Sequence, residues 1–352
     1  MKKRIVSLML VLVMALGLVA CGGSSEEAAE ETTVTWNYGS SGNVLVTIAN
    51  EMGYFEEEGI VIEPVEATAN ADAMALLASG KVNVVSNAGT SNPLQQISQG
   101  VDITVFGGHM IEGCMPVIAL PETEWNGIES FVGESVAVNP SYFAFTGALL
   151  DAGVEDPMNE VDWVITSGYD EALAKLMAGE VKYALQGTGQ VEGVNKLVEE
   201  GKVQIVAFHS DIMENYSCCR MVAQTSWVDE NPDTVKAILR ALLRAQSWYE
   251  ANKEEAVALH AAAIDATESY VGAYMLDDEH YFVSVDPLGN GVRRAWDILD
   301  KTGYLGEDCQ INIEDHINTA LYEEALAEAT ELYGEEAPEF YEAMATFFAE
   351  NN

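Results

Sequence analysis

Strand-like and helical segments alternate along most of this chain of 352 residues, and this alternation restricts the fold it can adopt. Runs of alternating or continuous apolar residues predict strands at 34–38, 60–65, 82–86, 103–106, 116–120, 136–138, 161–165, 181–185 and 203–208. Apolar residues at helical spacing predict helices at 44–52, 71–79, 143–152, 170–178, 191–200 and 234–252. Such alternation is typical of α/β proteins, in which helices cover a largely parallel sheet.

The alternation restarts after Pro121, which indicates a second α/β unit. Beyond Ser226 the pattern becomes mostly helical, and Pro232 suits the first turn of a long helix because its missing N–H has no partner there.

A helix–glycine–strand segment occurs twice, about one hundred residues apart. The first copy ends in Asn87, Gly89 and Thr90, and the second ends in Gln186, Gly187 and Thr188. Ligands of open α/β sheets bind at the carboxyl ends of strands, so these six residues are candidate ligand contacts. The alternative is that helix–glycine–strand is a generic feature of such folds.

The N-terminus has the features of a secretory signal peptide at residues 1–20. Three basic residues precede an apolar run that is too short to span a membrane comfortably, and small residues lead to Cys21. The sequence Leu-Val-Ala-Cys resembles the bacterial lipobox, in which the cysteine is acylated, so we expect a lipid on Cys21. An ordinary signal peptide is the alternative. Residues 21–33 are small and acidic, which predicts a solvated tether.

The formal net charge of −41 argues against binding to nucleic acid or to anionic lipid surfaces.

Four cysteines follow Cys21, namely Cys114, Cys218, Cys219 and Cys309, and their spacing matches no zinc motif. We expect free thiols, with a bridge from Cys114 to Cys218 or Cys219 as the open alternative. We predict no metal, no cofactor and no catalytic residues, since the chain has no GxSxG, HExxH or GxxxxGK[ST] sequence.

Five short segments resemble the pattern of solute-binding proteins that serve importers of nitrate, sulfonate, taurine and thiamine precursors. They are 53–60 (GYFEEEGI), 80–84 (GKVNV), 131–138 (FVGESVAV), 179–184 (GEVKYA) and 231–235 (NPDTV). Asn83 stands where this family usually has Asp. The resemblance covers about 34–250, whereas the region after about 255 matches poorly.

The resemblance implies a type II periplasmic-binding-protein fold with two α/β lobes, a central cleft and crossover hinge strands. Lobe 1 would comprise residues 34–121 and 217–352, and lobe 2 residues 122–216. It also implies a monomeric, extracytoplasmic receptor that closes on a small molecule and delivers it to the permease of an ABC importer with a separate ATPase. A ligand sensor with the same fold and, less favoured, an extracellular enzyme are the alternatives.

Further candidate contacts follow from the expected cleft. Ser40, Ser41 and Asn43 precede a helix N-terminus, where they either bind a ligand or cap the helix. His109 follows a strand near the expected crossover. Ser141 is the favoured contact from the second lobe, because family members have Ser or Thr near this position, and Tyr142 could stack on a flat ligand.

The mature chain has no arginine before Arg220, although tight binding of sulfonates often uses a bidentate arginine. The expected ligand is therefore a sulfonate, nitrate or taurine held by other groups, or a neutral or cationic aromatic such as a thiamine-like pyrimidine.

Overall fold

The computed structural model describes residues 31–39, 42–67, 70–306 and 308–352, and residues 31–352 form one unit by their contacts. The predicted signal peptide, Cys21, and residues 22–30 of the predicted tether lie outside the described residues, as do Ser40 and Ser41. The tether was predicted to reach residue 33. That limit is wrong, because Thr32 and Thr33 already pair with the neighbouring strand.

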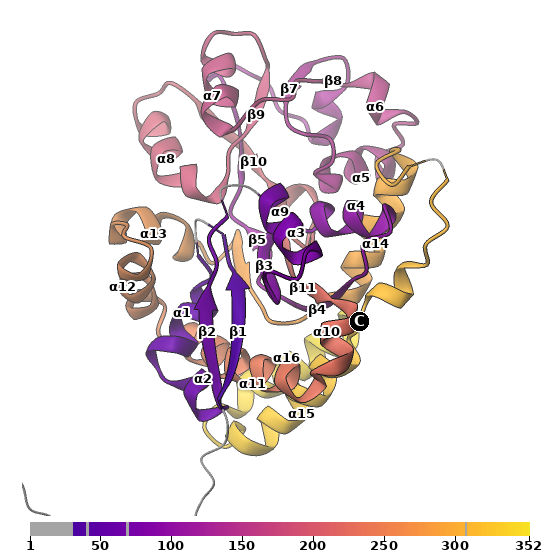
Figure 1. Cartoon of the computed structure of the whole chain (residues 1–352). Helices are drawn as coiled ribbons and strands as arrows, with labels where there is room; N and C mark the ends of the chain where they lie inside the picture. Colours follow the sequence, from indigo (N-terminus) through magenta and orange to yellow (C-terminus); the bar gives the residue numbers. More distant parts are fainter. Residues whose placement is uncertain (1–30, 40–41, 68–69, 307) are drawn as a thin grey trace, which may run out of the picture. The chain divides into compact units, whose positions relative to one another are not determined.

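The first sheet has five strands in the order β2-β1-β3-β11-β4 (Figure 1). Their bounds are β1 Thr32–Asn37, β2 Ile60–Pro64, β3 Val84–Gly89, β4 Ile103–Gly108 and β11 Cys219–Gln224. Strand β1 is parallel to β2 and β3, whereas β11 is antiparallel to β3 and β4. The periodicity predicted every strand of this sheet except β11.

The second sheet has the order β10-β6-β9-β7-β8. Its strands are β6 Pro116–Ala119, β7 Ser135–Ala137, β8 Asp162–Trp163, β9 Tyr183–Leu185 and β10 Gln204–Phe208. Strand β6 is antiparallel to both of its neighbours, and β7 is parallel to β8 and β9. Each sheet therefore contains one antiparallel strand, β11 in the first and β6 in the second.

Helices make up most of the remaining chain. The helices of the first half are α1 Val44–Glu51, α2 Tyr54–Glu57, α3 Asn70–Ala78, α4 Ser91–Ser98, α5 Phe143–Asp151, α6 Pro157–Glu160 and α7 Tyr169–Met177. The later helices are α8 Val191–Glu199, α9 His209–Ile212, α10 Thr225–Glu230, α11 Pro232–Ala251, α12 Lys253–Ala263, α13 Glu268–Met275, α14 Gly289–Lys301, α15 Ala320–Tyr333 and α16 Pro338–Asn351. Three single turns of 3-10 helix lie at Ile128–Phe131, Thr188–Gln190 and Ile313–His316.

Both faces of the first sheet are buried, because successive side chains of its strands enter two different apolar clusters. Val84 packs in a cluster with residues of α1, α11 and α15, whereas Val85 packs in one with residues of α3 and α14. Phe106 and Val105 divide in the same way. A strand with helices on both sides reads as a continuous apolar run, which explains why the sequence pattern located these strands.

The chain passes between the two sheets twice. The first crossing segment, residues 109–115, connects β4 to β6 and contains β5 (Met110–Gly113), which pairs with β12 (Tyr281–Val283). The second crossing segment, residues 209–218, connects β10 to β11 and contains α9. The Cys218 N–H donates to the Ile111 carbonyl at 3.0 Å, so the two crossing segments are bonded to each other.

Strand β6 lies before the lobe boundary predicted near residue 121, yet it pairs with β9 and β10 of the second sheet. The division of the chain into lobes at residues 121 and 217 stays a prediction. The sequence pattern also missed helix α4, strand β5 and strand β12.

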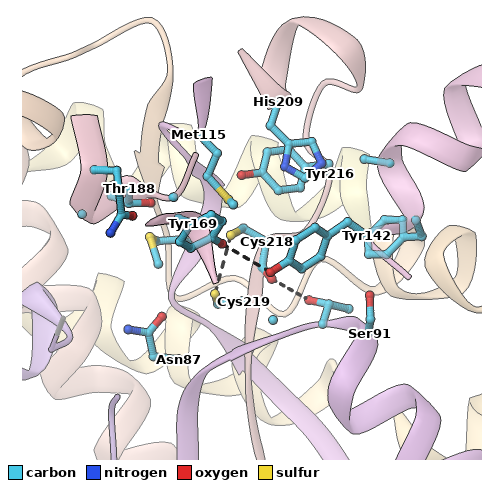
Figure 2. A pocket seen from close by; sticks show the side chains of 18 of the residues that line it. Asn87, Ser91, Met115, Tyr142, Tyr169, Thr188, His209, Tyr216, Cys218 and Cys219 are labelled. Carbon is cyan, nitrogen blue, oxygen red and sulfur yellow. Dashed lines mark hydrogen bonds between the residues drawn. The ribbon is translucent and has the colours of Figure 1, made fainter. Parts of the chain in front are cut away.

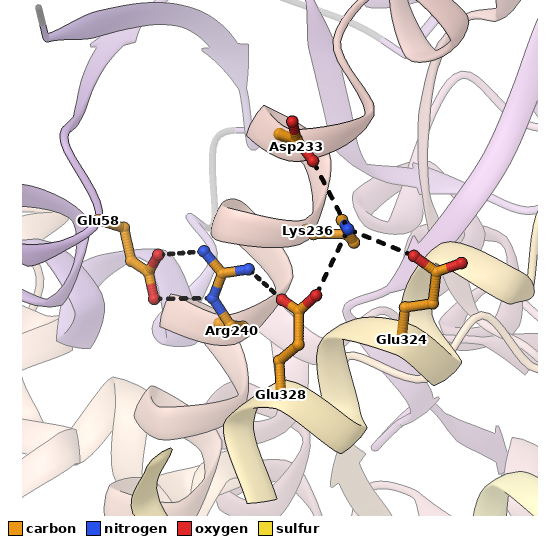
Figure 3. Close-up of polar contacts among 6 residues, drawn as sticks. All are labelled: Glu58, Asp233, Lys236, Arg240, Glu324 and Glu328. Carbon is orange, nitrogen blue, oxygen red and sulfur yellow. Dashed lines mark hydrogen bonds and ion pairs between the residues drawn. The ribbon is translucent and has the colours of Figure 1, made fainter. Parts of the chain in front are cut away.

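Helices α11, α12, α13, α15 and α16 pack on the side of the first sheet that carries α1 and α2, whereas α14 packs on the side that carries α3. A polar network joins α11 and α15 (Figure 3): Arg240 of α11 binds Glu58 at 2.5 Å and also pairs with Glu328 of α15. Lys236 lies 3.3 Å from Glu324 and 3.4 Å from Glu328. The partners of Lys236 are exposed carboxylates, and exposed ion pairs are worth at most about 1 kcal/mol each. Arg240 binds Glu58 through two nitrogens where both side chains are largely buried, so this pair is the best-ordered part of the network.

Candidate functional site

A cavity of about 370 Å³ lies where residues of both sheets meet the two crossing segments (Figure 2). The first sheet and α4 contribute Asn87, Gly89, Thr90 and Ser91, and the part of the chain that holds the second sheet contributes Tyr142, Phe143, Ala144, Tyr169, Gly187, Thr188, Gly189 and Gln190. The crossing segments and β11 contribute Met110, Met115, His209, Tyr216, Cys218 and Cys219, and α13 contributes Tyr270. A volume of this size suits a small organic molecule.

Six residues that the repeated segment and the expected cleft had singled out line this cavity together. They are Asn87, Gly89, Thr90, Tyr142, Gly187 and Thr188. Strand β3 continues through Gly89, so Asn87 and Gly89 belong to the strand itself and not to a loop after it. The Asn87 amide nitrogen donates to the carbonyls of Tyr38 (3.2 Å) and Gly42 (3.0 Å), which fixes its orientation at the cavity edge.

The two threonines hold the crossing segments. The Thr90 hydroxyl donates to the carbonyl of Ser217, and the Thr188 hydroxyl donates to the carbonyl of Gly113. Thr90 precedes α4 but makes no side-chain cap there. Each hydroxyl thus gives its proton to the backbone of a crossing segment and keeps only acceptor capacity, and its use as a ligand contact stays a prediction.

Four predicted contacts lie outside the cavity lining. Asn43 caps α1, because its side-chain oxygen accepts from the N–H groups of Leu45 (3.1 Å) and Val46 (3.3 Å), so the structure favours the capping interpretation. The buried Gln186 amide donates to the Tyr169 and Leu185 carbonyls.

Ser141 and His109 are the other two. Ser141 is buried and its carbonyl accepts from the Ser91 hydroxyl at 2.5 Å, so it supports the cavity wall through its backbone. His109 is buried beside Arg220, and neither of its ring nitrogens has a hydrogen-bond partner among the residues that the structure describes.

His209 lines the cavity although no sequence pattern indicated it. Its ring lies between Tyr216 and Phe145, with centroid distances of 3.9 and 4.4 Å. Within the described part of the chain, neither ring nitrogen has a hydrogen-bond partner. Burial lowers the pKa of His209 to about 3, so the imidazole in the cavity wall is neutral and carries one donor and one acceptor. No motif marks this residue, because its position depends on the second crossing segment.

The cavity wall combines apolar side chains with uncharged polar ones. Among the described residues that line it there is no Asp, Glu, Lys or Arg. Burial raises the pKa of Tyr142 and of Tyr169, whose hydroxyls lie 3.3 Å apart, so both stay protonated. The Arg220 guanidinium does not line the cavity and donates instead to the carbonyls of Asp286 (2.9 Å) and Met110 (2.7 Å).

Within the described residues, no group of three or more His, Cys, Asp or Glu side chains is arranged to hold a metal ion. In the part of the chain that the structure describes, no helix has the length and the apolar character needed to cross a membrane.

Two mixed five-stranded sheets, joined by two crossing segments with a cavity where they meet, define the periplasmic-binding-protein fold. The structure is similar to the periplasmic aliphatic sulphonate binding protein SsuA from Escherichia coli, with a TM-score of 0.66 and 15% identity over 83% of this chain and 92% of that one. It is also similar to the periplasmic nitrate-binding protein NrtA from Synechocystis PCC 6803, with a TM-score of 0.65 and 15% identity over 85% and 89% of the two chains. The predicted α/β fold is confirmed.

The chain belongs to the NMT1/THI5-like family, whose sequence model matches residues 43–256. It is 26% identical over 212 residues to the 4-amino-5-hydroxymethyl-2-methylpyrimidine phosphate synthase of Schizosaccharomyces pombe, which covers 56% of this chain and 59% of that protein. The chain thus spans less than two thirds of the length of the curated relatives it matches. The family resemblance expected from the sequence is confirmed.

Proposed function

We propose that this protein is a solute-binding receptor that captures a small, uncharged, aromatic molecule. The observation that supports this most directly is the cavity itself, which aromatic, amide, thiol and hydroxyl groups line and no charged side chain enters. Tight sulfonate binding commonly uses a bidentate arginine, so this wall favours the pyrimidine-like ligand over nitrate and sulfonates.

The ligand would be recognised on its faces and on its edges. The rings of Tyr142, Tyr169 and Tyr270 offer stacking surfaces, and aromatic pairs are worth about 0.5–1.5 kcal/mol beyond the area they bury. The neutral imidazole of His209 offers a donor and an acceptor to a ring edge that carries an amino group and a ring nitrogen.

Capture would proceed by hinge closure about the two crossing segments. Residues from both sheets line the cavity, so a ligand that contacts both stabilises the closed arrangement. The closed receptor would deliver its ligand to the permease of an ABC importer that a separate ATPase drives.

The N-terminal sequence supports extracytoplasmic anchoring through a lipid on Cys21. A tethered receptor stays near its permease at a raised local concentration, and stable retention requires more than one acyl chain. Metabolic labelling with a palmitate analogue tests this directly. The wild-type protein should be labelled and the Cys21→Ala protein should not, whereas equal labelling of the two would contradict the anchor.

A thermal-shift panel on the purified protein tests the ligand class. The panel contains 4-amino-5-hydroxymethyl-2-methylpyrimidine, its phosphate, taurine and nitrate. A ligand at one hundred times its Kd should stabilise the protein by about 2.7 kcal/mol. We expect the uncharged pyrimidine to raise the melting temperature and the three anionic or zwitterionic compounds to have little effect. A shift with taurine or nitrate alone would overturn the proposed class.

An enzyme is the alternative that the comparisons raise, because the curated relatives are named as pyrimidine phosphate synthases. Incubation with whichever compound gives a shift, followed by mass spectrometry of the small molecules, separates the two functions. A receptor returns its ligand unchanged, and a new product that accumulates with time would favour the enzyme.

A further inference from the structure

Two adjacent cysteines, Cys218 and Cys219, lie where the second crossing segment enters β11. We propose that Cys218 and Cys219 form a redox-reactive thiol pair in the cavity wall, which hydroperoxides convert into a disulfide between the neighbouring residues. Both residues line the cavity, and their sulfur atoms lie in hydrogen-bond contact at 3.6 Å (Figure 2). The site is a place of covalent modification that goes beyond the proposed receptor function.

The backbone around the pair holds the two side chains in place. The Cys218 N–H donates to the Ile111 carbonyl at 3.0 Å, and the Cys218 carbonyl accepts from the Thr90 N–H at 2.9 Å. The Cys219 carbonyl accepts from the His109 N–H at 3.2 Å. Ser217, just before the pair, has a left-handed φ of 59°, a conformation that costs energy for a residue with a Cβ. The geometry of the pair is thus imposed by both crossing segments.

The surroundings make the two sulfurs chemically different. Hydrogen bonds from the Cys219 thiol and the Tyr216 hydroxyl, with the nearby Arg220 guanidinium, lower the pKa of Cys218. The same hydrogen bond raises the pKa of Cys219, and burial adds to that effect. Cys218 is half-buried and faces the cavity, so it is the attacking sulfur, whereas the buried Cys219 keeps its proton.

The reaction balances with a hydroperoxide as the oxidant. The Cys218 thiolate attacks one peroxide oxygen, the O–O bond breaks, and Cys218 becomes a sulfenic acid while hydroxide leaves and takes up a proton. The Cys219 thiol then displaces water from the sulfenic acid and the S–S bond forms. With hydrogen peroxide, two thiols and one peroxide give one disulfide and two water molecules.

The product would be a readily reversible bond. An S–S bond brings the sulfur atoms to about 2 Å, and a ring between adjacent residues strains the peptide that joins them. Strained disulfides have the more oxidising potentials and are the labile ones, so this pair is suited to switching and not to holding the fold together.

Trypsin places the two thiols in one peptide, because Lys202 and Arg220 are consecutive cleavage sites. Cys114 and Cys309 fall in other peptides. After treatment of the purified protein with hydrogen peroxide, we expect peptide 203–220 to lose the mass of two hydrogen atoms, and dithiothreitol to restore it. A cross-link to Cys114, a cross-link between two chains, or no mass change while Cys309 reacts would each overturn the proposal.

Variants separate the roles of the two sulfurs. Alkylation at neutral pH should be several-fold faster at Cys218 than at Cys309, which is also half-buried and serves as the matched control. Cys219→Ser should leave Cys218 reactive but stop its oxidation at the sulfenic acid, which a dimedone probe detects. Cys218→Ser should remove the fast reaction, and Cys309→Ser should leave it unchanged. Equal rates at Cys218 and Cys309, or a disulfide that survives in Cys219→Ser, would contradict the assigned roles.

Discussion

The two copies of the helix–glycine–strand segment reach the same cavity but use their polar residues differently. Gly80 and Gly179 both adopt left-handed φ values, 68° and 73°, where the helix ends. Thr90 and Thr188 both bind the carbonyl of a crossing segment. Asn87 and Gln186 both donate to backbone carbonyls, but Asn87 lines the cavity, whereas Gln186 lies outside its lining. The two copies therefore share the threonine hydrogen bond to a crossing segment, but they differ in whether the preceding amide side chain lines the cavity.

The correspondence extends to two histidines one hundred residues apart. His109 follows β4 and His209 follows β10, so each begins a crossing segment. Both are buried, and their ring nitrogens have no hydrogen-bond partner in the described ranges of the chain. Burial lowers the pKa of each to about 3, and His260 and Arg220 add to the effect at His109. Only His209 lines the cavity. The first residue of the second crossing segment thus lines the cavity, whereas the first residue of the first crossing segment does not.

The largest expected effect concerns protons on these histidines. The unfolded chain binds a proton at each histidine near pH 6.5, and the folded chain only near pH 3, so falling pH through this range favours unfolding. We expect His209→Phe, which retains the stacking on Tyr216, to reduce the loss of stability from about pH 7 to about pH 4 by about 2–3 kcal/mol. Urea unfolding across pH measures this. His109→Leu should have a similar effect, and a pH dependence unchanged in both variants would show that other groups cause acid unfolding.

The second prediction contrasts the two glycines at the strand ends. A Cβ on Gly187 would lie 2.5 Å from Cε2 of Tyr169, whereas a Cβ on Gly89 would meet nothing closer than Nδ2 of Asn92 at 3.7 Å. We expect Gly187→Ala to destabilise the protein by about 1–3 kcal/mol through overpacking, and Gly89→Ala to change stability by less than about 0.5 kcal/mol. Denaturant unfolding of the two variants measures this. Equal losses in the free energy of unfolding would contradict the steric difference between the two glycine positions.

The smallest effect distinguishes the two threonines. Thr90→Val leaves the buried Ser217 carbonyl without its hydroxyl donor and should cost about 1–2 kcal/mol. Thr188→Val should cost about 0.5–1 kcal/mol, because Thr188 is half-buried whereas Thr90 is buried. The matching Thr→Ser variants keep the hydroxyl and should recover most of each loss. A larger loss at Thr188 than at Thr90 would reverse the order of burial inferred for the two sites.

Local patterns were enough for much of the fold. The strands that enter two apolar clusters form continuous apolar runs, and the glycines after α3 and α7 mark where each helix ends. Strands β5 and β12 were missed because they are four and three residues long and pair with each other across 170 residues of chain. Helix α4 was missed because its eight residues include a proline and several polar side chains.

The sequence by itself determined the α/β class, the family and the two strand ends that meet at the cavity, because each depends on periodicity or on short motifs. Only the tertiary structure decided which polar groups face the cavity. His209, Tyr216 and the thiols of Cys218 and Cys219 reach it through the second crossing segment and the start of β11, whose path is set by bonds to Ile111, Thr90 and Gly113 far away in sequence. Asn43 and Gln186 lie outside the lining, and their amides bind nearby backbone groups. Asn87 also donates to two backbone carbonyls and still lines the cavity, so the path of the chain, and not hydrogen bonding alone, decides which polar groups reach it. That path depends on contacts between segments far apart in sequence, which no local pattern contains.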